Sequence, residues 1–213
     1  MDGRRVYVDI ETLPGELSPE ELTQLTRKKV PRNIKREDTI ARWMTDNRDS
    51  VHRKTALSAL HGRILCIAVG TDDTDEIESF YGVDNCLYEF CTWLHGYQGT
   101  IAEYRIEWVG WNVRFDLQFL RLHAARLDLE RIGLALPRRS SEILDLQAIA
   151  TAYQRGQYMS LADAAGFFGW AKGEGLDGSM IYDTYRQGEH DLIRRYCEQD
   201  VRLTRELAWK LWA

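Results

Sequence analysis

The stretch Arg5-Val-Tyr-Val-Asp-Ile-Glu-Thr12 decides the fold. Its residues alternate and most are β-branched or aromatic, which predicts a β-strand over residues 5–12. Because strand side chains point alternately to two faces, Asp9 and Glu11 share one face, opposite Val8 and Ile10. Two adjacent carboxylates on a half-buried strand repel each other, and a divalent cation with oxygen ligands removes this conflict. For this pair alone, two solvated acids on an edge strand are the alternative.

The rest of the chain continues with strands and then with alternating strands and helices. The expected strands are residues 5–12, 62–70, 76–82 and 106–111, and the expected helices are residues 84–97, 115–127, 143–153, 160–168 and 189–211. This order predicts an α/β fold in which helices flank a mixed central sheet.

Residues 13–60 interrupt this order with a long polar segment. It contains two helix-like stretches, residues 20–29 and 39–44, and a run at residues 27–36 with six basic and no acidic residues. We interpret the segment as an insertion into a single domain of residues 1–213. The basic run is either a solvated face or a surface that follows nucleic-acid phosphates.

Composition excludes several classes of protein. The chain of 213 residues is 44% apolar and 29% charged, and no apolar stretch approaches the ~20 residues of a membrane span. The first residues lead into a strand without an apolar signal core, and the four scattered cysteines are typical of reduced thiols, so we expect a cytoplasmic protein. A net charge of −5 argues against a general nucleic-acid coat protein but not against an enzyme that meets phosphates through metal ions.

Two further segments carry carboxylates in suggestive positions. Tyr196 and Asp200 are four residues apart on the expected last helix, so they share its core-facing side. A buried carboxylate there is costly unless an arginine pairs with it or a metal binds it. In Gly110-Trp-Asn-Val-Arg-Phe-Asp116, Asp116 falls near a helix N-terminus, where capping alone is also a common role.

Taken together and in this order, Asp-x-Glu, Asn-x-x-Phe-Asp and Tyr-x-x-x-Asp resemble the three motifs of the DEDD superfamily of 3′–5′ exonucleases. The similarity is to the tyrosine-bearing subclass, which includes the proofreading domains of family B DNA polymerases, and most of all to stand-alone bacterial and phage exonucleases. The histidine subclass is disfavoured because Arg195 occupies the position of its histidine. The resemblance implies a ribonuclease H-like fold.

The resemblance also implies a catalytic site with two divalent cations, Mg²⁺ or Mn²⁺. Asp9, Glu11 and Asp200 would hold the cation that activates water, Asp9 and Asp116 would hold the cation at the leaving oxygen, and Tyr196 would orient the water. The all-oxygen ligand set suits these hard cations better than zinc.

The residues implied to bind substrate lie beside the catalytic ones. Thr12 and Leu13 would meet the 3′-terminal nucleotide, with Leu13 wedged against the base. Asn112 either contacts the terminal nucleotide or caps the following helix, and Phe115 either touches a base or belongs to the core.

The function expected from these features is metal-dependent 3′–5′ exonuclease activity on the 3′ end of single-stranded nucleic acid, with release of nucleoside 5′-monophosphates. DNA is favoured over RNA only through the family resemblance. The alternatives are a non-catalytic nucleic-acid-binding module on the same fold and a ribonuclease H-like, structure-selective endonuclease.

Overall fold

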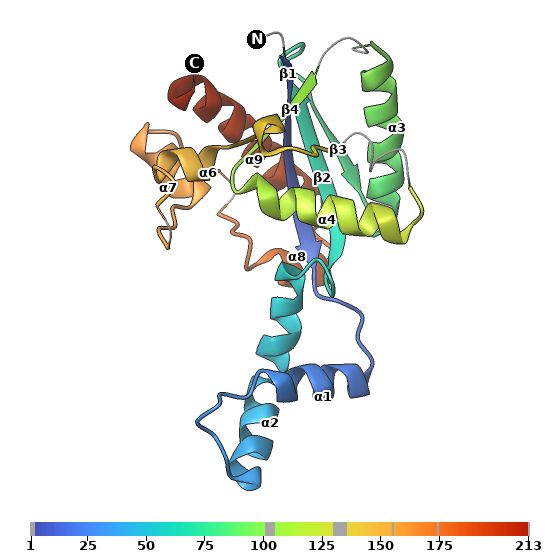
Figure 1. The fold of residues 1–213 in the computed structure, drawn as a ribbon, viewed down its shortest axis with the longest axis vertical. Coiled ribbons are helices and arrows are strands. Elements are labelled where there is room, and N and C mark those ends of the chain that lie inside the picture. The colour runs from blue at the N-terminus through green and yellow to red at the C-terminus, as the bar shows by residue number, and fades with distance from the viewer. Residues whose placement is uncertain (1–2, 101–104, 130–135, 155, 174, 213) are drawn as a thin grey trace. The chain divides into compact units, whose positions relative to one another are not determined.

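The computed structural model describes residues 3–100, 105–129, 136–154, 156–173 and 175–212 (Figure 1). These residues form two compact units. Unit 1 comprises residues 1–11 and 64–213, and unit 2 comprises Thr12–Arg63. Unit 2 covers nearly the same residues as the expected insertion at 13–60.

Unit 1 is built on a five-stranded sheet with the order β3-β2-β1-β4-β5. The strands are β1 (Gly3–Leu13), β2 (Arg63–Thr71), β3 (Ile77–Tyr81), β4 (Arg105–Gly110) and β5 (Ile143–Asp145). Strand β1 pairs in parallel with β4, β4 pairs in parallel with β5, and β2 pairs antiparallel with β3. The sheet is therefore mixed, as the sequence predicts.

Helices cover this sheet. They are α3 (Asn85–Thr100), α4 (Val113–Arg126), α6 (Leu146–Ala150), α7 (Leu161–Phe167), α8 (Ile181–Arg186) and α9 (His190–Leu211), with a short 3₁₀ helix η2 (Ser140–Glu142) before β5. None of the helices described is both long and apolar enough to cross a membrane.

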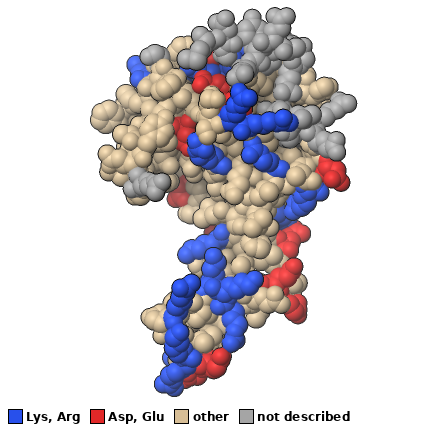
Figure 2. Space-filling model, viewed as in Figure 1, with Lys and Arg blue, Asp and Glu red and all other residues tan. Residues whose placement is uncertain are grey.

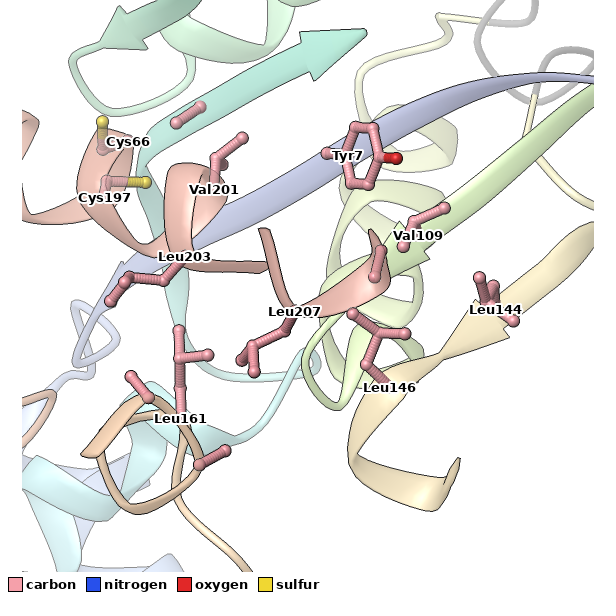
Figure 3. Close-up of a cluster of buried hydrophobic side chains, with 14 residues drawn as sticks. Tyr7, Cys66, Val109, Leu144, Leu146, Leu161, Cys197, Val201, Leu203 and Leu207 are labelled. Atoms are coloured by element: carbon pink, nitrogen blue, oxygen red, sulfur yellow. The ribbon is translucent and has the colours of Figure 1, made fainter. Parts of the chain in front are cut away.

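The alternation along β1 and β4 assigns the helices to the two faces of the sheet. Tyr7 and its β4 partner Val109 belong to the core cluster that also holds residues of α6, α7 and α9 (Figure 3). Trp108, on the opposite face, meets Phe90 of α3 edge-on, with ring centroids 6.4 Å apart. Asp9 and Glu11 have the parity of Tyr7 and therefore lie on the face that α9 covers.

Helix α9 is amphipathic along its whole length. Its buried residues recur at intervals of three and four, which is one stripe of an α-helix: Ile193, Tyr196, Cys197, Asp200, Val201, Leu203, Thr204, Leu207 and Ala208. Ser79 Oγ of β3 donates to Glu198, and Tyr81 Oη lies 2.6 Å from His190 Nδ1. These contacts fix the helix against the sheet and determine where Tyr196 and Asp200 lie.

Unit 2 consists of helices α1 (Pro19–Lys28) and α2 (Glu37–Arg53), followed by the 3₁₀ helix η1 (Lys54–Leu57). Ser18 and Glu21 form a capping box at the start of α1. Arg48 of α2 donates to Thr23 Oγ1 and to the Pro19 carbonyl, which ties the two helices together.

Two expectations about secondary structure are wrong. Residues 143–153 are not one helix, because Ile143 to Asp145 pair with β4 and only then, with Asp145 as N-cap, does α6 begin. A short apolar run fits a strand or a helix equally well, and only the sheet decides between them. The second insertion helix spans Glu37–Arg53 and not 39–44, because its C-terminal half is too polar to show an apolar stripe.

Candidate active site

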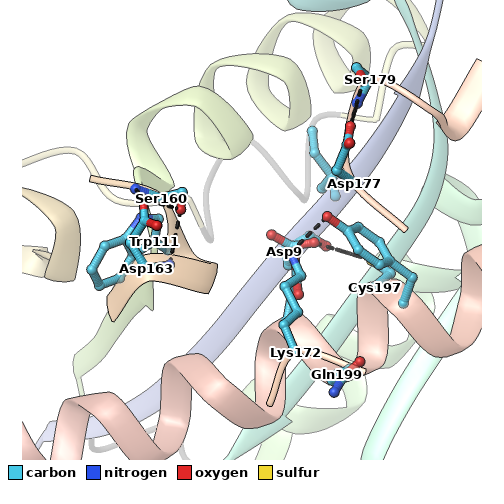
Figure 4. Close-up of polar contacts among 12 residues, drawn as sticks. Asp9, Trp111, Ser160, Asp163, Lys172, Asp177, Ser179, Cys197 and Gln199 are labelled. Atoms are coloured by element: carbon cyan, nitrogen blue, oxygen red, sulfur yellow. Dashed lines mark hydrogen bonds and ion pairs between the residues drawn. The ribbon is translucent and has the colours of Figure 1, made fainter. Parts of the chain in front are cut away.

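The first pair of expected catalytic residues lies against α9. Asp9 is half-buried and Glu11 is buried, and the Sγ of Cys197 on α9 lies 3.5 Å from Asp9 Oδ2 (Figure 4). One potential ligand atom from each of Asp9, Glu11 and Cys197 falls within a group 4.8 Å across. This is the group of potential ligand atoms, found among the residues that the structure describes, that is compact enough to hold one metal ion.

Asp116 reaches the same strand from α4. Its Oδ1 accepts a hydrogen bond from the Ile10 amide, 3.1 Å away, so it lies beside the backbone between Asp9 and Glu11. The turn that delivers it needs glycine, because a Cβ at Gly110 would lie 2.7 Å from Val113 Cβ. A role limited to capping the helix does not describe Asp116, since its carboxylate binds the backbone of β1.

Asp200 and Tyr196 share a partner that the sequence does not reveal. The ammonium group of Lys172, in the segment between α7 and α8, lies 2.7 Å from Asp200 Oδ2 and 2.7 Å from Tyr196 Oη. It also lies 4.2 Å from the centre of the Tyr196 ring. Lys172 is therefore a counter-ion inside the acidic site, with side-chain exposure of only 14%.

The site is electrostatically strained. Burial, together with the neighbouring acid, raises the pKa of Asp9, Glu11 and Asp116 well above the ordinary range of carboxyl groups. Burial raises the pKa of Asp200 to about 6, although Lys172 pulls it down. These carboxyl groups therefore favour uptake of protons or of a cation.

The donor set fits a divalent cation. Asp200 Oδ1 is buried and lacks a hydrogen-bond partner among the described residues, although its Oδ2 is paired. An unpartnered carboxylate oxygen beside other buried acids is the arrangement that an oxygen-seeking cation satisfies. Asp9, Glu11, Asp116 and Asp200 carry carboxylate oxygens, the donor type that Mg²⁺ and Mn²⁺ prefer, and of these four only Asp9 and Glu11 belong to the compact group described above.

The Tyr196 hydroxyl accepts a hydrogen bond from Lys172 and keeps its own proton. Burial and the nearby Asp200, Glu11 and Asp9 carboxylates raise the pKa of its phenol above the ordinary value. The hydroxyl therefore stays protonated at neutral pH and suits a role in orienting a water molecule rather than in removing its proton.

The expected substrate residues Thr12 and Leu13, which are the last two residues of β1, are not fully exposed. Thr12 Oγ1 donates to the Ala56 carbonyl, 2.8 Å away, and the Leu13 side chain is fully buried. Both residues belong to unit 2. Contact of Leu13 with a base stays a prediction that requires this side chain to become exposed.

The expected substrate residues at α4 are more accessible. Asn112 is exposed, occupies the N-cap position with a left-handed φ of 58°, and its side chain makes no capping hydrogen bond. The side-chain amide of Asn112 is therefore available to a ligand. This weakens the alternative that Asn112 only caps α4. Phe115 is half-buried, with its ring 4.9 Å from that of Phe119, and this geometry accommodates both a core role and contact with a base.

Sequence reasoning missed Lys172 and Cys197. Lys172 lies in an irregular segment, where no periodicity indicates the direction of a side chain. Cys197 adjoins Tyr196 on the buried stripe of α9, so its burial could have been predicted, but its contact with Asp9 depends on how α9 crosses the sheet.

The basic run of residues 27–36 comprises the last two residues of α1 and the loop that leads to α2. Lys and Arg side chains gather on unit 2 in the space-filling view (Figure 2). Two of its six cations are already paired, Arg27 with Glu37 and Arg36 with Asp38. Lys28, Lys29, Arg32 and Lys35 are exposed and form no ion pair with any residue that the structure describes.

Comparison with known families supports the expected class of enzyme. Residues 134–208 match a family described as "Predicted 3'-5' exonuclease related to the exonuclease domain of PolB". The matched segment contains Lys172, Tyr196 and Asp200 but not Asp9, Glu11 or Asp116. No protein of curated function matches the chain. Similarity to a predicted exonuclease family is therefore established for this segment, and the resemblance read from the N-terminal motifs is independent of it.

Proposed function

We propose that the chain is a metal-dependent 3′–5′ exonuclease of the tyrosine-bearing class, which removes nucleoside 5′-monophosphates from the 3′ end of single-stranded DNA. The observation that supports this most directly is the meeting of three distant segments. Asp9 and Glu11 of β1 face α9, Asp116 bonds the backbone between them, and the buried Asp200 oxygen lacks a partner among the described residues. The match of residues 134–208 supports the same class of reaction.

In this proposal, Asp9, Glu11 and Asp200 would hold one divalent cation, and Asp9 with Asp116 would hold a second. Cations bound there would supply a hydroxide nucleophile at neutral pH and stabilise the departing 3′ oxygen. The four carboxylates would offset the charge of two such ions.

Tyr196 positions the attacking water through its protonated hydroxyl. Lys172 fixes the orientation of this hydroxyl, because its ammonium donates to the phenol oxygen and leaves the phenol proton available to another acceptor. The same ammonium offsets part of the charge of Asp200 when no metal is bound. Lys172 is thus a positioning residue.

The single strand would approach the site along basic and aromatic side chains. Asn112 and Phe115 are the accessible contacts for the terminal nucleotide, and Thr12 and Leu13 are additional contacts if Leu13 becomes exposed. The unpaired cations of the basic run are candidates to contact phosphates of the strand. Four free cysteines suit an enzyme that works in a reducing cytoplasm.

The test is digestion of 5′-labelled single-stranded DNA and RNA, side by side, with Mg²⁺, Mn²⁺ or a chelator. We expect a ladder that shortens one nucleotide at a time from the 3′ end, release of nucleoside 5′-monophosphates, and no reaction with chelator. Faster digestion of DNA than of RNA is expected.

Two other outcomes would replace the proposal. Cleavage of circular single strands, which have no 3′ end, would identify an endonuclease. Tight binding of the strand without hydrolysis in either metal would identify a non-catalytic binding module.

A further inference from the structure

Unit 2 contains a hollow that only its own residues line. Its volume is about 500 Å³, and its walls come from α1, α2, η1 and the residues after η1. The lining residues are Leu25, Lys29, Trp43, Asn47, Ser50, Val51, Lys54, Thr55, Ser58 and His61.

The charged residues that line this hollow are all basic. Lys29, Lys54 and His61 are exposed at the hollow, and no acidic residue is among the described residues that line it. Two lysines without a carboxylate at the same surface make a local positive potential, which attracts an anion.

An aromatic side chain lies among these cations. Trp43 is half-buried on α2, and the apolar Leu25 and the buried Val51 line the same hollow. Asn47 Nδ2 donates to the Trp43 carbonyl, 2.8 Å away, which is a contact within one turn of α2. The Asn47 side-chain oxygen can therefore accept a hydrogen bond from a ligand.

A flat aromatic ring, flanking lysines and a few side-chain hydrogen-bond groups are what single-stranded nucleic acid requires. Bases stack on aromatic side chains, and phosphates are neutralised by lysine. A base within a duplex already has both faces stacked, so a ring of this kind selects unpaired bases.

We propose that this hollow binds one nucleotide of a single strand, with its base against Trp43 and a neighbouring phosphate at Lys29 and Lys54. The inference deepens the proposed function, because it gives the exonuclease a second point of attachment to its substrate. It concerns unit 2 alone and is tested separately from hydrolysis.

The first experiment measures binding of 5′-fluorescein-labelled oligothymidylate of 12 nucleotides by fluorescence anisotropy. The full chain is used in chelator, so that the strand stays intact. We expect Trp43→Leu, which keeps an apolar side chain without a flat ring, to weaken binding by about 5- to 150-fold. Trp43→Phe, which keeps a ring, should weaken binding much less.

The matched control lies in unit 1. Trp209 of α9 is 57% exposed and Lys210 follows it, so the control variants are Trp209→Leu and Lys210→Gln. Both should bind the oligonucleotide like the wild type. The double variant Lys29→Gln and Lys54→Gln should lower the slope of log affinity against log salt by about 1.4, because each phosphate that is no longer neutralised lowers it by roughly 0.7.

A second measurement needs no substitution and so does not depend on how a variant folds. The same oligonucleotide carrying 5-iodouracil is irradiated with the wild-type chain, which is then digested with trypsin. Trypsin cuts after Arg42 and Arg48, so a crosslink to Trp43 appears on the fragment of residues 43–48. A crosslink on this fragment supports the site, and crosslinks confined to other fragments overturn it.

A third measurement separates this inference from the proposed function. The p-nitrophenyl ester of thymidine 5′-monophosphate contains a single nucleotide and reports on the catalytic site alone. The Trp43 variants should hydrolyse it at the wild-type rate. Absent hydrolysis by the wild type would contradict the exonuclease and leave the binding result intact. Normal hydrolysis with unchanged oligonucleotide binding in Trp43→Leu would overturn the nucleotide site, and the exposed Leu57 and Leu60 would then point to a protein partner.

Discussion

Unit 1 and unit 2 differ in the sign of their charge. Unit 2 carries eleven Lys and Arg against seven Asp and Glu, a net of +4, whereas the rest of the chain carries seventeen against twenty-six, a net of −9. In unit 1 the carboxylates of the acidic site are buried close together, and their mutual repulsion favours binding of a cation. In unit 2 the cations are exposed, where they can meet phosphates directly. The net charge of −5 is thus the sum of an acidic unit 1 and a basic unit 2.

The two units also differ in how they are held together. Unit 1 has a sheet whose strand β2 is almost wholly buried and whose large core is apolar. Unit 2 buries few apolar side chains and relies on polar ties. Thr55 Oγ1 accepts from the Gly15 amide, and Arg63 pairs with Glu16. The buried acids of unit 1 are therefore held by a packed apolar core, whereas the exposed cations of unit 2 lie on helices joined by polar contacts.

The largest effect is expected from the acids of unit 1. Asp9→Asn should lower hydrolysis by about 10⁴-fold or more, a barrier increase of about 5 kcal/mol, because Asp9 is assigned to both cations. Asp200→Asn should do the same. Single-turnover cleavage of a 3′-terminated strand at saturating Mn²⁺ is the measurement, and substantial turnover in either variant would contradict the metal assignment.

The same two variants should separate in metal-free stability. Asp9→Asn removes a charge that raises the pKa of Glu11 and Asp116, so its melting temperature in chelator should rise by about 2–4 °C per kcal/mol of repulsion removed. Asp200→Asn also removes a carboxylate whose ionised form burial disfavours, but it leaves the buried Lys172 ammonium without its anionic partner, so its melting temperature should rise less than that of Asp9→Asn. Equal shifts in both variants would contradict the pairing of Lys172 with Asp200.

Tyr196→Phe should have an intermediate effect on catalysis. The ring and its packing remain, but the hydroxyl is removed, so turnover should fall by about 10- to 1000-fold, or ~1.4–4 kcal/mol. Binding of Mn²⁺, measured by calorimetry, should hold, because the phenol is not a ligand in this proposal. Full activity in this variant would leave the carboxylates as the whole catalytic apparatus.

Stability without metal should depend on pH in unit 1. The folded-state pKa of Asp200 is about 6, above the value near 4 of an unfolded carboxyl group, so the folded state binds the extra proton. Its contribution is fully present below pH 4 and is lost as the pH rises through about 6. In chelator, the melting temperature should therefore fall between about pH 4 and 7, and Mn²⁺ should reverse the fall at about pH 7. A melting temperature that rises over this range in chelator would contradict the raised pKa.

Sequence periodicity could predict which site residues share a face of the same strand or helix. The period of two places Asp9 and Glu11 on one face, and the period near 3.6 places Tyr196 with Asp200. What it could not predict depends on contacts between distant segments. The apolar residues 143–145 become a strand only because β4 offers a partner, and Lys172 reaches Asp200 from an irregular segment.

The smallest effect concerns the free lysines of unit 2. Lys28→Gln with Lys35→Gln should weaken binding of a single strand several-fold at low salt and lower the slope of log affinity against log salt by about 1.4, if each lysine contacts one phosphate. Saturated turnover should be unchanged, because neither residue belongs to the acidic site. Arg27→Gln with Arg36→Gln is the matched control, since Glu37 and Asp38 already pair with these arginines, and it should change the slope less. Equal slopes in the two double variants would mean that only the total charge of unit 2 matters, and an unaltered slope in the lysine variant would assign the run to a solvated face.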